Sequence, residues 1–268
     1  LHKGHRKLIA EAKNIAVEQK LSLSLFTIRK FSPANELLSF GETTEICQDL
    51  GIDSVIYANE DQNFFDTAPD EFLNALKERF FARCFVCGKD FTYGKDRLGN
   101  AQTLINYCKE NSLFYKIVNT VEQSGEKISS TDIKNYLICG EVKMANELLD
   151  KEFFVSGVVV RGRSEGARLG FSTANIIYPD NKVRIKRGVY ATKTVVGEKE
   201  YNSISNFGAA PTFGFSDELL ETHIIDYIGD LYGKEITIKF VDFIRENKKF
   251  ADRERLIEQL NKDIKYYD

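Results

Sequence analysis

Apolar residues in the first half of the chain repeat at helical spacing in some segments and at strand spacing in others. A helix is predicted for residues 5–19, where apolar positions recur every three or four residues. Further helices are predicted for residues 42–50, 69–80 and 98–109, and strands for residues 21–28, 52–57, 84–87 and 115–118. Strands that alternate with helices predict an α/β domain with a mostly parallel sheet.

The pattern changes near residue 150, where two short predicted helices end. Beyond this point the strands follow one another closely, at residues 154–160, 188–196, 200–206, 222–227 and 235–243. Closely spaced strands favour a closed or nearly closed antiparallel barrel. A last helix is predicted for residues 250–264, with Leu256, Ile257 and Leu260 on one side. The sequence therefore predicts two domains, at residues 1–150 and 151–268.

Length and charge narrow the class of protein. The chain has 268 residues, which is enough for two domains of ordinary size. It carries 37 Lys and Arg against 40 Asp and Glu, and this net charge of −3 argues against a nucleic-acid-binding protein. No apolar run approaches the roughly 18–20 residues that a membrane-crossing helix needs. We therefore expect neither nucleic acid nor a membrane as a partner.

The cysteines predict a reducing environment. Five Cys are scattered along the chain, and this odd number suits the cytoplasm better than a disulfide scaffold. Cys84 and Cys87 have the spacing of a redox or zinc pair, but no second pair follows at a metal-binding distance. Side chains three residues apart on a strand point to opposite faces of the sheet, so we interpret this pair as packing residues.

The run His2-Lys3-Gly4-His5 lies directly before the first predicted helix. The N-terminus of a helix offers free N–H groups and a partial positive charge to phosphates. The imidazoles of His2 and His5 are suited to donate hydrogen bonds to phosphate oxygens, and Gly4 lets the backbone approach. Two histidines near the start of a chain also occur by chance on protein surfaces, so this run needs support from other motifs.

A second helix start lies at Ile128-Ser129-Ser130-Thr131. Ser130 is predicted to cap the helix that follows, and Gly140 is predicted to end it. Ser130 and Thr131 would then offer a further site to phosphates. The alternative is that both residues only cap the helix.

Four segments resemble the bacterial bifunctional riboflavin kinase/FAD synthetases. Leu169–Asn175 resembles that family's Leu-Gly-Phe-Pro-Thr-Ala-Asn, and Glu221–Tyr227 resembles its Glu-x-His-hydrophobic-hydrophobic-Asp-aromatic strand. Gly88–Gly94 resembles a Gly-x-Asp/Asn-Phe-x-Phe-Gly segment, and Ile128–Lys134 resembles Ile-Ser-Ser-Thr-x-Ile-Arg. The start of the chain matches the end of the nucleotidyltransferase motif His-x-Gly-His. The resemblance covers nearly the whole chain.

The resemblance implies an architecture and two reactions. Residues 1–150 would form a Rossmann-like nucleotidyltransferase domain of the α/β class, which converts FMN and ATP to FAD and pyrophosphate. Residues 151–268 would form an antiparallel β-barrel riboflavin kinase domain with a C-terminal helix, which converts riboflavin and ATP to FMN and ADP. ATP, riboflavin, FMN and FAD are thus the expected small-molecule partners, and Mg²⁺ is the expected metal. We expect a cytoplasmic monomer or weak homo-oligomer.

The resemblance also implies the site residues. In the first domain His2 and His5 would be catalytic, and the binding residues would be Gly4, Asp90, Ser130, Thr131 and Lys134. In the second domain Thr173 and Asn175 would hold Mg²⁺ and phosphate, and their spacing on an extended segment places both side chains on one face. Glu221 would be the general base, at the start of a strand on the barrel rim. Further binding residues are the loop residues Gly162, Gly166 and Ser172, and Arg245, which is expected to pair with phosphate or with Glu221.

The sequence departs from the family pattern at three positions. Ser172 replaces a Pro, and a looser loop that costs about 0.4–1 kcal/mol of order predicts slower kinase turnover. Lys134 replaces an Arg and loses its bidentate fork, and Ala167 replaces a frequent Arg. Two alternatives therefore stay open: an enzyme with one activity degraded, and a non-catalytic flavin-binding regulator. The family pattern also leads us to expect residues before Leu1 and an additional segment near Ile28.

Overall fold

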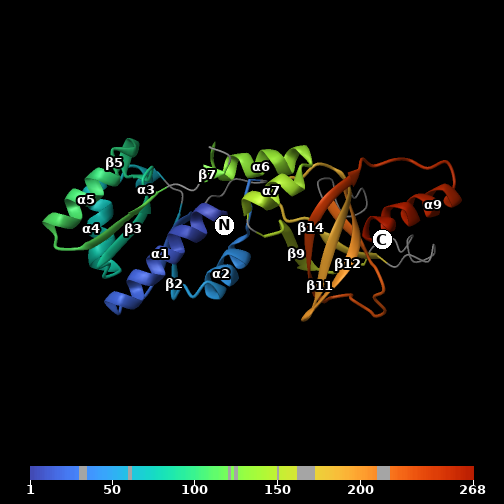
Figure 1. Ribbon diagram of the computed structural model, residues 1–268, viewed down its shortest axis with the longest axis horizontal. Helices are drawn as coiled ribbons and strands as arrows, with labels where there is room; N and C mark the ends of the chain where they lie inside the picture. Colours follow the sequence, from blue (N-terminus) through green and yellow to red (C-terminus); the bar gives the residue numbers. More distant parts are fainter. Residues whose placement is uncertain are drawn as a thin grey trace. The chain divides into compact units, whose positions relative to one another are not determined.

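The computed structural model describes residues 1–29, 35–59, 62–119, 122–123, 126–149, 151–161, 173–209 and 218–268. The chain forms two compact units, drawn in Figure 1. The first unit contains Leu1–Ser32 and Leu38–Ser129, and the second contains Pro33–Leu37 and Ser130–Asp268. Each unit is described by itself.

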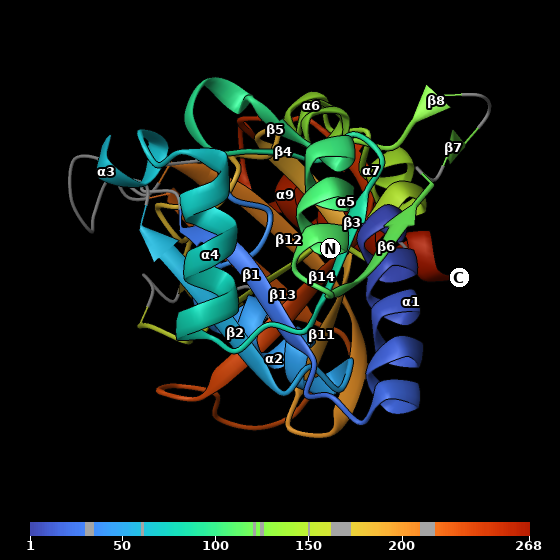
Figure 2. The same cartoon turned by 90° about the vertical axis from the view of Figure 1, so that its left-hand side faces the viewer.

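The first unit is an α/β domain with parallel strand pairs, as the sequence predicted. Strand β1 pairs in parallel with β2, and β3 pairs in parallel with β6. Figure 2 shows helices on both sides of these strands. The elements are α1 (Lys3–Gln19), β1 (Ser24–Arg29), α2 (Phe40–Asp49), β2 (Ser54–Asn59), α3 (Gln62–Phe65), α4 (Pro69–Arg79), β3 (Cys84–Gly88), β4 (Thr92–Tyr93), the 3₁₀ turn η1 (Lys95–Arg97), β5 (Gly99–Asn100), α5 (Ala101–Glu110), β6 (Phe114–Val118), β7 (Glu122–Gln123) and β8 (Glu126–Lys127).

Two apolar clusters hold the helices of this unit to its strands. One cluster packs α4 and α5 against β3 and includes Leu73, Cys87, Leu104 and Cys108. The other contains Ile9 of α1 and Cys47 of α2, with residues of β1 and β2 around them. All five cysteines are free thiols, and burial raises the pKa of Cys87 and Cys108 to about 11. Cys87 is therefore a protonated core residue at neutral pH.

The second unit is a six-stranded antiparallel sheet with helices beside it. The strand order is β10-β13-β12-β11-β14-β9. The backbone N–H of Val160 donates to the carbonyl oxygen of Asn175 at 2.8 Å, and this bridge brings the two ends of the sheet together. The nearly closed barrel is therefore as predicted. Its elements are α6 (Ser130–Cys139), α7 (Val142–Leu149), β9 (Phe154–Val158), β10 (Thr173–Ile177), β11 (Gly188–Val196), β12 (Lys199–Ala209), β13 (Glu218–Ile224), β14 (Glu235–Arg245), α9 (Arg253–Ile264) and the 3₁₀ turn η2 (Lys265–Tyr267).

One face of the barrel sheet carries a chain of hydroxyl groups that are fully buried. Ser205 bonds to Thr192 at 2.8 Å and to Thr222 at 2.7 Å, and Ser203 bonds to Thr192 and Thr194 at 2.9 and 2.8 Å. Because each hydroxyl has a partner, the polar groups do not carry the cost of unsatisfied burial. The same face is completed by large apolar side chains such as Phe207 and Leu220.

Helices α6 and α7 belong to the second unit by their contacts. Asn146 of α7 donates to the backbone oxygen of Phe240 at 2.8 Å and accepts from the backbone N–H of Phe153 at 2.7 Å. Figure 1 shows α7 and α9 on opposite sides of the barrel. The boundary between the two activities at residue 150 stays a prediction.

The predicted position of β13 was wrong by several residues. The strand spans Glu218–Ile224, where the sequence had predicted residues 222–227. It ends early because Asp226 adopts a left-handed conformation, with φ of 59°, which turns the chain. Glu221 consequently lies in the middle of a strand between two neighbours, and its predicted place at a strand start on the barrel rim is corrected.

Candidate active sites

The N-terminus of α1 brings together the three residues of the His-x-Gly-His motif. His2 is the N-cap, and its Nδ1 accepts a hydrogen bond from the backbone N–H of Gly4 at 3.1 Å. The proton of a neutral His2 ring therefore lies on Nε2. The ring centroids of His2 and His5 are 3.9 Å apart. Both imidazoles thus lie at the N-terminus of a helix, where the helix dipole favours an anion.

His5 is neutral at physiological pH. Burial, with a smaller contribution from the positive N-terminus, lowers the pKa of the imidazole from 6.5 to about 4, although the residue as a whole has exposed surface. Gly4 is needed beside His2 for a steric reason: a Cβ atom at this position would lie 2.9 Å from Cε1 of His2. Glycine at this position therefore lets the His2 ring keep its place, where the sequence had predicted close backbone approach.

The other residues predicted for nucleotide binding lie at loop and helix starts. Asp90 is exposed in the turn after β3, at the carboxyl end of a parallel strand, where α/β proteins bind ligands. In the second unit, Ser130 is the first residue of α6 and Thr131 the second. The cap position therefore falls on Ser129, one residue before the predicted one, because the helix begins earlier than its apolar pattern suggested.

Lys134 and the end of α6 are both defined by local contacts. The ammonium of Lys134 donates to Oδ1 of Asn35 at 3.0 Å. Gly140 follows the last helical residue with φ of 85°, and its N–H donates to the carbonyl oxygen of Leu137 at 3.1 Å. The predicted helix stop at Gly140 is confirmed, because glycine adopts this left-handed conformation without strain.

Three polar residues form a row across three strands of the barrel. Glu221 on β13 lies directly opposite Asn175 on β10 and directly opposite Asn206 on β12. Paired residues of antiparallel strands project their side chains on the same face of the sheet. Thr173, two residues before Asn175, donates its hydroxyl hydrogen to Oε1 of Glu221 at 2.9 Å. The structure therefore brings Thr173, Asn175 and Glu221 together, as the sequence predicted.

The donor set at Thr173 and Asn175 fits Mg²⁺. Both residues offer oxygen atoms on one face of β10, and Asn175 is only 5% exposed. The Thr173 hydroxyl gives its hydrogen to Glu221 and keeps lone pairs for a cation. No cluster of three or more His, Cys, Asp or Glu side chains suited to a metal occurs among the described residues. Mg²⁺ keeps several waters and takes few protein ligands, with substrate phosphates supplying further oxygens, so two protein oxygens suffice here.

Arg245 does not pair with Glu221. At the end of β14 its guanidinium binds Asp263 of α9 in a bidentate manner, with Nη2 2.7 Å from Oδ2 and Nε 3.0 Å from Oδ1. Gln259 adds a further hydrogen bond to Asp263 at 2.8 Å. The side chains of Arg245 and Asp263 are 12% and 1% exposed. The pairing expected with Glu221 is therefore corrected, because a buried carboxylate on α9 holds this arginine.

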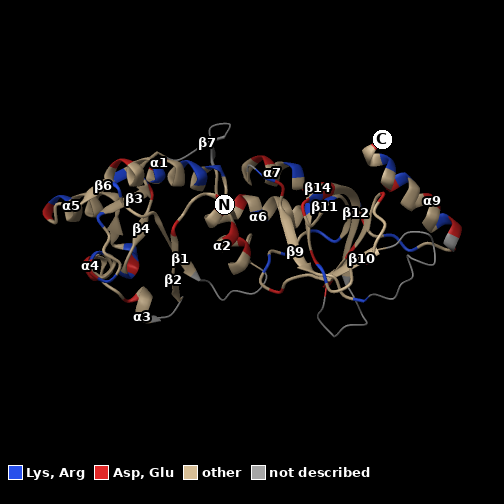
Figure 3. Cartoon of the chain, turned by 90° about the horizontal axis from the view of Figure 1, so that it is seen from below, with Lys and Arg blue, Asp and Glu red and all other residues tan. Residues whose placement is uncertain are grey.

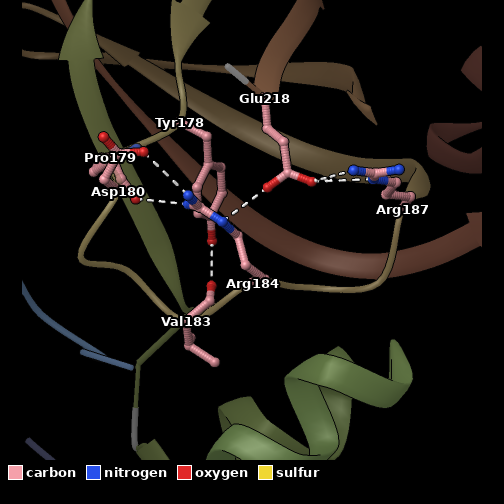
Figure 4. A network of polar contacts seen from close by, with 7 residues as sticks. All are labelled: Tyr178, Pro179, Asp180, Val183, Arg184, Arg187 and Glu218. Atoms are coloured by element: carbon pink, nitrogen blue, oxygen red, sulfur yellow. Dashed lines mark hydrogen bonds and ion pairs between the residues drawn. The ribbon is translucent and has the colours of Figure 1, made fainter. Parts of the chain in front are cut away.

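A network of polar contacts fixes the start of β13 (Figure 4). Glu218 accepts from Arg184 at 2.8 Å and from Arg187 at 2.8 Å. Arg184 also donates to the backbone oxygen of Pro179 at 2.8 Å. Because Glu218 lies three residues before Glu221, these contacts help to hold the strand that carries the carboxylate. Sequence patterns did not single out this network.

Some predicted residues are not located by the structure. Gly162, Gly166 and Ser172 lie outside the described residues.

Charges of both signs are interspersed along helices such as α1 and α9 (Figure 3). None of the helices in the described ranges has both the length and the apolar character needed to span a membrane.

Comparison with known proteins extends the resemblance to both halves of the chain. The FAD synthetase family model matches residues 1–132, and the riboflavin kinase family model matches residues 149–268. The bifunctional riboflavin kinase/FMN adenylyltransferase of Bacillus subtilis is 29% identical over 100% of this chain and 89% of its own length. The enzyme of the same name from Buchnera aphidicola subsp. Acyrthosiphon pisum is 31% identical over 98% of this chain and 88% of its own.

A solved structure shares the fold. The crystal structure of a Streptococcus pneumoniae protein described as a macrolide-efflux protein has a TM-score of 0.88 and 27% identity, and the match covers 98% of this chain and 89% of that one. The curated relatives match along the whole chain, and the two family models describe its two parts. The chain therefore belongs to the family of bifunctional riboflavin kinase/FMN adenylyltransferases.

Proposed function

We propose that this chain phosphorylates riboflavin in residues 151–268 and adenylylates the resulting FMN in residues 1–150. The observation that carries the kinase assignment is the hydrogen bond between Thr173 and Glu221, with Asn175 directly opposite Glu221. The close pair of His2 and His5 rings at a helix N-terminus supports adenylyl transfer.

In the kinase step, Glu221 accepts the proton of the riboflavin 5′-hydroxyl as that oxygen attacks the γ-phosphorus of ATP, and ADP leaves. Oε1 of Glu221 is held by the Thr173 hydroxyl. Among the described residues no donor is bonded to Oε2, so this oxygen is left to accept the substrate proton. Thr173 and Asn175 would hold Mg²⁺, which supplies positive charge to the transferring phosphate when it is bound.

In the adenylyl step, a phosphate oxygen of FMN attacks the α-phosphorus of ATP, and pyrophosphate leaves. Nε2 of His2 donates a hydrogen bond to a phosphate oxygen, because its Nδ1 is already used by Gly4. His5 and the positive end of the α1 dipole would add stabilisation of negative charge at the same place. No covalent intermediate is needed, so alignment and charge stabilisation provide the catalysis.

The partners of this activity are ATP and the flavins riboflavin, FMN and FAD. The presence of five free thiols supports a working place in the reducing cytoplasm. We also propose that the protein acts without nucleic acid, as a monomer or weak homo-oligomer. Sedimentation over a range of protein concentrations tests the oligomeric state.

A time course with riboflavin, ATP and Mg²⁺ tests the proposed function, with the flavins separated by chromatography. We expect FMN to rise first and FAD to follow. If FMN forms without FAD, the protein has only the kinase activity. If FAD forms only when FMN is supplied, the protein has only the adenylyltransferase activity. No product from either flavin would refute the proposal and favour a flavin-binding protein.

Replacing Gly4 by alanine is expected to impair FAD synthesis. The new Cβ atom would lie 2.9 Å from the His2 ring and would displace it. A displacement of about 1 Å lowers the rate of an aligned reaction by about 100-fold, so we expect a loss of up to this size. FAD formation from supplied FMN measures the effect, and riboflavin phosphorylation should stay unchanged.

Gly41→Ala is the matched control, because Gly41 lies in a helix of the same unit and has no heavy atom within 4 Å of an added Cβ. Its FAD synthesis should equal that of the unmodified protein. If the Gly4→Ala variant forms FAD at the normal rate, the observed position of the His2 ring is not needed for adenylyl transfer.

A further inference from the structure

Asn206 has a buried side-chain atom that its protein surroundings do not explain. Its Oδ1 is buried and accepts no hydrogen bond in the described part of the chain, while the residue as a whole is partly exposed. Burial of an unsatisfied carbonyl oxygen is costly, and native proteins rarely keep one without a reason. The described part of the chain offers this atom no donor, so a bound ligand is a candidate source of one.

The position of Asn206 relates it to the candidate base. Asn206 on β12 lies directly opposite Glu221 on β13, and Glu221 lies directly opposite Asn175 on β10. All three side chains project on the same face of the sheet. The row therefore contains two carboxamides with the carboxylate between them.

The order within the row distinguishes two sides of Glu221. Thr173 and Asn175, the candidate ligands of Mg²⁺ and phosphate, lie on the β10 side. Asn206 lies on the opposite side, and neighbouring strands are about 4.8 Å apart, so the two asparagine Cα atoms are separated by about 10 Å. The phosphate donor and the hydroxyl that attacks it have to meet at the base. If phosphate lies on the β10 side, the hydroxyl-bearing substrate lies on the β12 side.

We propose that Asn206 binds the polyol chain of the flavin, with Oδ1 accepting a hydrogen bond from one of its hydroxyl groups. This inference rests on the proposed kinase function of the same barrel. The match is chemical, because an acceptor without a donor is complementary to a hydroxyl group. Asn206 is thus a substrate-binding residue that positions the chain so that its terminal hydroxyl reaches Glu221.

The test is the variant Asn206→Leu, which keeps the shape of the side chain and removes the acceptor. We expect the KM for riboflavin in the phosphorylation reaction to rise about 10-fold, as for the loss of one hydrogen bond. The KM for ATP and the Mg²⁺ concentration for half-maximal rate should stay the same. The melting temperature should be equal or higher, because an unsatisfied buried oxygen has been removed.

Asn202→Leu is the matched control, because Asn202 lies on the same strand and is exposed. It should leave every constant unchanged. If Asn206→Leu fails to fold, Asn206→Ala removes the same acceptor without adding volume and is expected to raise the KM for riboflavin in the same way.

Three outcomes would overturn the inference. An unchanged KM for riboflavin would exclude contact with the polyol. A shift in the Mg²⁺ requirement alone would mean that the donor is a metal-bound water. A lower melting temperature with equal changes in both KM values would mean a structural role. Failure of the unmodified protein and of Asn202→Leu to make FMN would refute the proposed kinase function instead.

Discussion

Replacing Glu221 by glutamine is expected to lower the turnover number for riboflavin phosphorylation by about 10²–10⁴-fold, the usual range for the loss of a general base. Glutamine is isosteric and its amide oxygen still accepts the hydrogen bond that Thr173 now donates to Glu221. The geometry is therefore kept, and only the ability to take up a proton is removed. FMN formation from riboflavin, followed by chromatography, measures the effect.

The same preparation provides an internal comparison. FAD formation from supplied FMN should be unchanged in Glu221→Gln, because no part of the proposed adenylyl chemistry uses this residue. Glu235→Gln is the matched control for the kinase, since Glu235 is an exposed carboxylate on β14 of the same barrel. A Glu221→Gln variant with near-normal turnover would remove Glu221 from the chemistry and leave it as a binding residue.

Replacing Asp263 by asparagine is expected to lower the free energy of unfolding of the second unit by about 3–5 kcal/mol, the usual cost of breaking one partner of a buried ion pair. Asp263 is 1% exposed and binds the Arg245 guanidinium through both carboxylate oxygens. The variant leaves the guanidinium charge buried without its counter-charge. Urea unfolding, monitored by a signal from the barrel, measures the loss.

Two further variants separate charge from packing. Glu258→Gln removes an exposed carboxylate from the same helix and should change the unfolding free energy by less than about 1 kcal/mol. The double variant Arg245→Met with Asp263→Leu replaces both charges by apolar side chains and should recover most of the lost stability. A loss below about 1 kcal/mol in Asp263→Asn would show that water screens the pair as it does on a surface.

Local patterns in the sequence were sufficient for most of the fold. The helical spacing of residues 5–19 and the close spacing of the strands after residue 150 predicted α1 and the barrel. The glycine at 140 marked a helix end, because its left-handed conformation is a property of the residue itself. The arrangement of His2, Gly4 and His5 likewise depends only on four consecutive residues at the start of α1. The sequence was therefore enough to predict it.

These local patterns failed where contacts with distant parts of the chain determine the bounds of a strand or the partner of a side chain. β13 begins and ends earlier than its alternation suggested, because its pairing with β10 and β12 sets its range. Arg245 was expected near phosphate or Glu221, but a carboxylate 18 residues further along the chain binds it. The buried state of that carboxylate depends on how α9 packs, which a charge pattern in the sequence does not contain.

By itself, the sequence determined the two-part architecture, the helix starts suited to phosphates, and the identities of Thr173, Asn175 and Glu221 as candidate kinase residues. Only the tertiary structure decided that Thr173 and Glu221, 48 residues apart, share a hydrogen bond and that Asn206 completes their row. The physical reason is the register of the sheet. A side chain gains its cross-strand neighbours from the pairing of distant strands, and a shift of one residue would turn it to the other face.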